Sequence, residues 1–227
     1  MKKGLFGLSW GEIALWAGSV TAILCAFLLF DRSGVWGLIA SLIGVTSLIF
    51  YAKGNYIGPI LMIVFCLLYG AISFTVAYYG EMITYVGMTL PLTVYTLVAW
   101  LRHPFQGKRT EVTVNHLRRK EIARMFALSV PVTAVFAILL AAVHTKNLIP
   151  GTVSVTTSFL AVYLTARRSA FYALAYAAND AVLVFLWALM SRENASYLSV
   201  TVCFAAFLVN DLYGFFSWRR MSRRQNL

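Results

Sequence analysis

The sequence predicts an all-α, polytopic membrane protein with eight transmembrane helices. Hydrophobic residues make up 60% of its 227 residues and charged residues 12%. A soluble domain of this size could not bury so much apolar surface, whereas a membrane-spanning helix needs roughly 20 consecutive, mostly apolar residues. Eight such runs follow one another, most of them joined by short turns: 11–30, 35–52, 55–76, 81–101, 122–143, 148–166, 169–190 and 195–217.

The first run, 11–30, follows two lysines in "MKKGLFGLSWGEIALW". It lacks the short apolar core and small-residue cleavage site of a signal peptide, so we interpret it as a retained helix. The turn residues "DRSG" end this run, and "KGN" ends the second. The fourth and fifth runs are separated by the longest polar stretch, 102–121. We expect this stretch to act as a hinge between two halves.

The positions of the basic residues predict the orientation of the helices. If the N-terminus is cytoplasmic, sixteen of the nineteen Lys and Arg residues fall on the cytoplasmic side, and only Arg32, Lys146 and Arg192 fall outside. Cytoplasmic loops of membrane proteins carry this excess. Both termini are therefore expected in the cytoplasm. The net charge of +11 indicates anionic lipid as a neighbour rather than nucleic acid.

The chain carries an internal repeat at an offset of 118 residues. Four aromatic pairs coincide at this offset: Tyr69 with Trp187, Tyr79 with Tyr197, Tyr95 with Tyr213, and Trp100 with Trp218. The repeat predicts two three-helix units, 35–101 and 148–217, joined by a connecting helix at 122–143 and preceded by an extra helix at 11–30. Three helices plus one connector give both units the same orientation, and transporters with parallel repeats bind substrate between them.

Two Asn-Asp pairs lie inside apolar runs, in "FYALAYAANDAVLVFLW" and "FAAFLVNDLYGFFSW". A carboxylate at membrane depth costs about 2.5–3.5 kcal/mol on insertion scales and normally faces a cavity or a partner. Asp180 is therefore a candidate site residue. Asp211 is another, although it could instead pair with Arg219. Alternatively, both pairs hold helices together through interhelical hydrogen bonds.

Polar and aromatic stripes accompany these aspartates at helical spacing. One stripe runs along 85–100 in the fourth span, and Ser154, Thr157, Ser158 and Thr165 form another in the sixth. Such side chains suit a solute with a flat ring and a hydroxyl-rich part. The substrate-binding candidates are Thr89, Thr93, Trp100, Tyr172, Tyr176, Asn179, Asp180, Trp187, Asn210 and Asp211. We assign no metal, no cofactor and no enzymatic activity, because no motif for them occurs.

The chain resembles the PnuC family of bacterial vitamin transporters, best known for nicotinamide riboside. The resemblance rests on "AKGNYIGPI", "YYGEMITYVGMTLPLTVYTLVAW", "TARRSAFYALAYAANDAVLVFLW" and "NDLYGFFSW". It implies a core of three plus one plus three helices in the bacterial inner membrane, a homotrimer, and facilitated diffusion. It also implies trapping of the vitamin by a cytoplasmic kinase, for NAD biosynthesis.

The chain departs from the nicotinamide riboside pattern at several positions. Thr93 stands where many members have Gln, and Leu97 where they have the first of two Trp residues. Ala173 and Tyr176 replace a Trp-x-x-Trp pair, whereas Trp100 is kept. Thiamine, riboflavin and deoxynucleosides are therefore alternative substrates, and proton-coupled uptake through Asp180 and Asp211 is an alternative mechanism. A non-transporting receptor or membrane anchor is the alternative of a different class.

Overall fold

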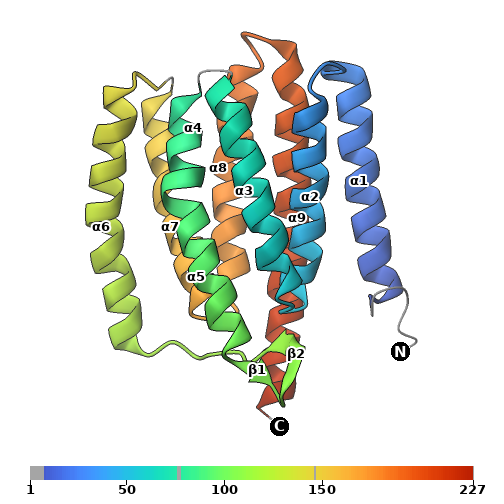
Figure 1. Cartoon of the computed structure of the whole chain (residues 1–227), viewed down its shortest axis with the longest axis vertical. Coiled ribbons are helices and arrows are strands. Elements are labelled where there is room, and N and C mark those ends of the chain that lie inside the picture. The colour runs from blue at the N-terminus through green and yellow to red at the C-terminus, as the bar shows by residue number, and fades with distance from the viewer. Residues whose placement is uncertain (1–7, 76–77, 146, 227) are drawn as a thin grey trace.

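The computed structural model describes residues 8–75, 78–145 and 147–226, and these are mostly helical. Within them, eight helical segments are long and apolar enough to cross a membrane, which confirms the predicted number. They pack side by side in one bundle (Figure 1). The helices are α1 (Trp10–Phe30), α2 (Val35–Ala52), α3 (Ile57–Thr75), α4 (Tyr79–Thr84), α5 (Leu90–Leu101), α6 (Arg119–Ala142), α7 (Leu148–Ala166), α8 (Tyr172–Met190) and α9 (Leu198–Gln225).

The two ends of the bundle differ. A β-hairpin and the C-terminal part of α9 lie at one end, which we call the hairpin end, and the α1–α2, α6–α7 and α8–α9 turns lie at the opposite end (Figure 1). α1 and α6 form the two flanks of the bundle. α2 contacts α3 and α9, and α7 contacts α8 and α5. The first helix of each predicted three-helix unit therefore packs against the last helix of the other unit.

The fourth span is one continuous helix with a π-helical turn at Tyr85–Thr89 between α4 and α5. Pro91 lies two residues after this turn, as the second residue of α5. Proline has no amide hydrogen and its ring clashes with the carbonyl four residues earlier, so a regular α-helix would be broken here. The wider turn accommodates the proline and lets the span continue. Such π-turns occur frequently at functional sites.

The linker between α5 and α6 forms a two-stranded antiparallel hairpin, β1 (Pro104–Phe105) and β2 (Lys108–Val112). It is tied to turns in both halves of the bundle. Val112 N donates to the carbonyl of Gly54 between α2 and α3, and Asn115 N donates to that of Arg168 between α7 and α8. The stretch expected to act as a hinge therefore bridges the halves through backbone hydrogen bonds.

Two helices extend beyond the apolar runs that predicted them. α9 continues to Gln225, past the predicted limit of 217, and α6 begins at Arg119 rather than 122. Apolar runs mark the part of a helix that lipid covers, and a polar extension can remain helical where it finds partners. For α9, Glu111 of β2 provides them, because it accepts hydrogen bonds from Arg224 and Gln225. For α6, Glu121 pairs with Arg167 in the turn after α7.

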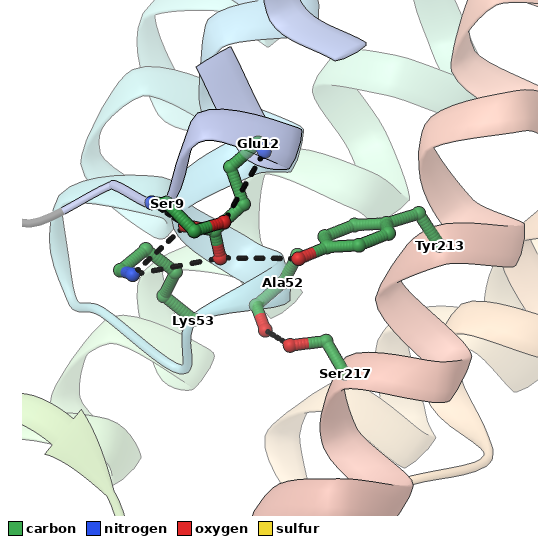
Figure 2. Close-up of polar contacts among 6 residues, drawn as sticks. All are labelled: Ser9, Glu12, Ala52, Lys53, Tyr213 and Ser217. Atoms are coloured by element: carbon green, nitrogen blue, oxygen red, sulfur yellow. Dashed lines mark hydrogen bonds and ion pairs between the residues drawn. The ribbon is translucent and has the colours of Figure 1, made fainter. Parts of the chain in front are cut away.

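A polar network near the hairpin end fixes α1 to the bundle (Figure 2). Glu12 is 6% exposed, and its carboxylate accepts hydrogen bonds from Lys53 at 3.3 Å and from the Tyr213 hydroxyl at 3.2 Å. Ser9 and Glu12 form a capping box that begins the helix. Figure 2 also shows Ser217 of α9 donating to the carbonyl of Ala52. These contacts join α1, the end of α2 and α9.

Candidate functional site

The two aspartates of the Asn-Asp pairs meet where α8 packs against α9. Asp180 and Asp211 are each 3% exposed, and their carboxyl groups lie close enough to interact. A hydrogen bond between two carboxyl groups needs one proton between them, since two carboxylates only accept. Asp180 Oδ2 has no hydrogen-bond partner among the described residues. The suggested pairing of Asp211 with Arg219 is not formed, and Arg219 lies over the Phe171 ring instead.

Asn179 is the acceptor for a cluster of hydroxyl groups on α7. Its Oδ1 accepts hydrogen bonds from Thr157 at 2.8 Å, Ser158 at 3.0 Å and Ser154 at 3.2 Å. Three of the four hydroxyls of the sixth-span stripe therefore converge on one buried amide oxygen, whereas Thr165 donates to the carbonyl of Ala161. This arrangement fixes the amide plane, so Asn179 is held beside Asp180 with a defined orientation.

Aromatic rings cover the hairpin side of the aspartate pair. The Tyr176 phenol faces both aspartates and Thr165, and Tyr172 faces Asp211. The Tyr172 hydroxyl is a second buried polar atom without a hydrogen-bond partner in the described part of the chain. The Tyr172 ring packs against Trp218 with centroids 4.9 Å apart. The centre of the α8–α9 interface thus combines two carboxyl groups, two phenols and their ring faces.

The threonines of the fourth span are buried, and their hydroxyls donate to backbone carbonyls of the same span. Thr93 is 1% exposed and its hydroxyl donates to the carbonyl of Thr89 at 2.7 Å. Thr89 donates to the carbonyl of Thr84, and Thr96 to that of Leu92. The oxygen of each hydroxyl can still accept a hydrogen bond. Trp100 lies nearer the hairpin end, where its indole nitrogen donates to the carbonyl of Thr165.

Asn210 lies at the contact between α9 and α1. Its amide nitrogen donates to the Ser19 hydroxyl of α1 and to the carbonyl of Ala206, each at 2.8 Å. Asn210 therefore bonds α9 to α1, whereas Asp211 of the same pair lies beside Asp180. Asn210 Oδ1 has no hydrogen-bond partner among the described residues.

A cavity of about 280 Å³ lies at the end opposite the hairpin, between α4, α6, α7 and α8. We call it the Glu81 chamber, because a buried oxygen of Glu81 lines it without a hydrogen-bond partner among the described residues. Trp187 is the predicted site residue that lines it. A second cavity of about 360 Å³ lies between α1, α2, α3 and α9, and shares Tyr78 and Trp187 with the first.

Glu81 and its neighbour Thr145 line this cavity and were not among the residues that the sequence predicted for a site. The available signal was an acidic residue at the start of the fourth span, in "YYGEMITY". An acidic residue at the boundary of an apolar run is ordinarily exposed to solvent. The structure instead buries the Glu81 side chain against Tyr69.

A helical bundle of eight spans with carboxyl groups buried in its interior is typical of membrane transporters. The family model described as the nicotinamide mononucleotide transporter matches residues 34–220. The chain therefore belongs to this family, as the resemblance to PnuC proteins implied. The nicotinamide riboside transporter PnuC of Neisseria mucosa is 24% identical over 232 residues, covering 99% of this chain and 87% of that protein.

A solved structure has the same fold. The crystal structure of the vitamin B3 transporter PnuC superposes with a TM-score of 0.83 at 21% identity, covering 97% of this chain and 95% of that one. Because the family and this structural neighbour are transporters, the chain is assigned to a transporter family and not to an enzyme family.

Proposed function

We propose that this protein takes up a riboside-like vitamin across the bacterial inner membrane, with nicotinamide riboside as the first candidate. Uptake is by facilitated diffusion, and a cytoplasmic kinase traps the vitamin by phosphorylating it for NAD biosynthesis. The hairpin end and both termini lie in the cytoplasm, and the protein works as a homotrimer. Membership of the transporter family and the similarity to a nicotinamide riboside transporter support the substrate class.

The observation that carries the proposal is the Asp180–Asp211 cluster. Two buried polar atoms there, Asp180 Oδ2 and the Tyr172 hydroxyl, have no partner among the described residues. Buried polar groups are nearly always hydrogen-bonded, so unsatisfied ones need an explanation. A ribose supplies hydroxyl donors for the carboxyl oxygen, and a flat nicotinamide ring suits the face of Tyr176. Asn179 and Thr93 complete the site, with Trp100, Thr89 and Trp187 around it.

Binding of purified protein to a panel of solutes tests this proposal. Calorimetry with nicotinamide riboside, thiamine, riboflavin and deoxynucleosides would identify the substrate, and the Asp180→Asn variant would be measured alongside. We expect nicotinamide riboside to bind and Asp180→Asn to weaken it at least tenfold. Binding of another solute of the panel would support the transport function and identify a different substrate. Absence of binding and of uptake into liposomes would favour a receptor or anchor.

Proton-coupled uptake is the second candidate mechanism, and the proximity of the two buried carboxyl groups of Asp180 and Asp211 favours it. Two interacting carboxyl groups can hold one proton between them, and the pair would release that proton when substrate binds. Uptake into liposomes with and without an imposed proton gradient separates the mechanisms. Facilitated diffusion predicts equal initial rates with and without the gradient. Coupling predicts a faster initial rate with the gradient, and the Asp211→Asn variant should lose this acceleration.

A further inference from the structure

The Glu81 chamber has the properties of a ligand site separate from the Asp180–Asp211 cluster. Three buried polar atoms on its walls lack a hydrogen-bond partner among the described residues: Glu81 Oε2, Thr145 Oγ1 and Trp187 Nε1. Trp187 is 4% exposed, so its N–H is shielded from lipid and from bulk water. Buried polar groups are nearly always hydrogen-bonded, so each unsatisfied one needs an explanation. Three around one cavity are therefore better explained by a ligand than by packing.

Local structure holds these groups in position. The turn after α6 places His144 in a left-handed conformation with φ of 51°, and Thr145 N donates to the carbonyl of Leu140 at 3.0 Å. Thr145 comes close to α4 because residue 80 is glycine, and a Cβ there would lie 2.7 Å from Thr145 Oγ1. The hydroxyl and the Glu81 carboxyl thus face the same space from two helices.

The donors and acceptors in the chamber match a vicinal diol. The Glu81 carboxyl oxygen accepts, the Trp187 indole donates, and the Thr145 hydroxyl does either. Burial raises the pKa of the Tyr78 phenol above its ordinary value, so this lining residue also remains a donor. In dinucleotide-binding folds, an Asp or Glu accepts from the 2′-hydroxyl of ribose in the same way. The aromatic faces of Tyr78 and Trp187 add ring contacts.

The chamber lies in line with the central cluster along α8. Trp187 and Asp180 are seven residues apart, so they share one face of the helix and are separated by two turns, about 10 Å. A solute that moves from the end opposite the hairpin toward Asp180 would therefore pass Trp187. This geometry makes the chamber an outer stopping point on the same path.

We propose that the Glu81 chamber binds the ribose diol of the solute before it reaches the central site, and so selects ribosides over 2′-deoxyribosides. The proposal rests on the proposed uptake function. It adds a second polar subsite that involves residues outside the predicted set. Recognition by Glu81 needs the 2′-hydroxyl, whereas recognition at Asp180 is tested independently.

Uptake into liposomes and binding by calorimetry test this selection. The probes are nicotinamide riboside, adenosine, cytidine and uridine, each paired with its 2′-deoxy form. For the ribosides that bind, we expect Glu81→Gln and Thr145→Val to raise KM or Kd about tenfold, the effect of losing one hydrogen bond to a carboxyl group, and to change maximal rate little. The 2′-deoxy forms should bind weakly and equally to wild type and Glu81→Gln. Glu111→Gln, the same change at the hairpin end, is the control and should behave as wild type.

The outcomes separate this proposal from the proposed function. Riboside binding that depends on Asp180 and not on Glu81 would contradict the proposal for the Glu81 chamber and support the proposed central site. Binding that depends on Glu81 and not on Asp180 would do the reverse. An equal loss for riboside and deoxyriboside in Glu81→Gln would show that the residue has no selective role. Retained melting temperature of both variants would exclude misfolding, and Thr145→Val gives an independent reading if Glu81→Gln fails to fold.

Discussion

Trp100 and Trp218 lie with their ring centroids 5.5 Å apart, and each donates its indole N–H to a backbone carbonyl in the other half of the bundle. Trp100 of α5 donates to Thr165 of α7 at 3.0 Å, and Trp218 of α9 donates to Tyr51 of α2 at 2.7 Å. In each case the last helix of one three-helix unit is bonded near the end of the first helix of the other. The two donors are 118 residues apart in the sequence and the two accepting carbonyls 114 residues apart, so the reciprocal bonds follow the predicted repeat closely but not residue for residue.

The first prediction concerns these two hydrogen bonds. Trp218→Phe keeps a ring in the core but leaves the Tyr51 carbonyl without its donor. Because Trp218 is 0% exposed, water cannot replace the lost bond. We expect a loss of about 1–3 kcal/mol in stability, and a similar loss for Trp100→Phe. Thermal unfolding in detergent measures both. Trp36→Phe, at a tryptophan that is 66% exposed on α2, should leave the melting temperature unchanged.

A large effect at one tryptophan and none at the other would contradict the reciprocal role. The double variant gives a further check. If each bond joins the halves independently, the two losses should add within about 0.5 kcal/mol, since contacts without shared partners are usually additive. Coupling through the packed rings would appear as a departure from that sum.

The helices were predictable from the sequence because apolar length alone identifies a membrane span. The boundaries of α9 were not, since its last turns are polar and remain helical through contacts with Glu111 on a distant strand. The hairpin at 104–112 was also missed, because its strands of 2 and 5 residues are too short to show alternation and its last residue is held by Gly54, far away in the sequence. Long-range contacts of this kind leave no local periodicity.

The sequence identified the residues of the central cluster better than their roles. Asp180 and Asp211 were selected because a carboxylate at membrane depth is costly, and the structure brings them together. The hydroxyl stripe on α7 was visible as well, but not its convergence on Asn179. Asn210 has the same pattern as Asn179 and bonds to α1 instead. Only packing distinguishes the two asparagines.

The second prediction compares removal of Asn179 with removal of one of the three hydroxyls that donate to it. Asn179→Ala removes the acceptor of all three hydroxyls and the polar group next to Asp180. We expect stability to fall by about 1–3 kcal/mol and substrate binding to weaken at least tenfold. Ser158→Ala removes one donor of three and should cost under about 1 kcal/mol with little change in binding. Melting temperature and calorimetric Kd measure both. Equal effects of the two changes would mean that Asn179 does not organise the cluster.

The third prediction concerns the attachment of α1. Glu12→Ala removes the acceptor for the Tyr213 hydroxyl and for Ser9 N, both in Figure 2. We expect a loss of about 1–3 kcal/mol in stability because three donors, Ser9 N, the Tyr213 hydroxyl and Lys53, lose this acceptor. Tyr213→Phe removes one bond and should cost less. Uptake into liposomes should keep its KM in both variants, since the central cluster lies on α8 and α9. A raised KM would assign α1 a part in transport.

The last prediction tests the proposed orientation. The hairpin carries Thr110 and the turn before α9 carries Ala195, both exposed and at opposite ends of the bundle. If the basic hairpin end is cytoplasmic, a cysteine at Ala195 will react with a membrane-impermeant maleimide in intact cells. A cysteine at Thr110 will react only after the membrane is permeabilised. Cys25 is replaced by Ser in both variants because it is exposed, whereas Cys66 and Cys203 are buried and can remain. The reverse labelling pattern would invert the topology, and with it the direction in which a solute meets the Glu81 chamber and then Asp180.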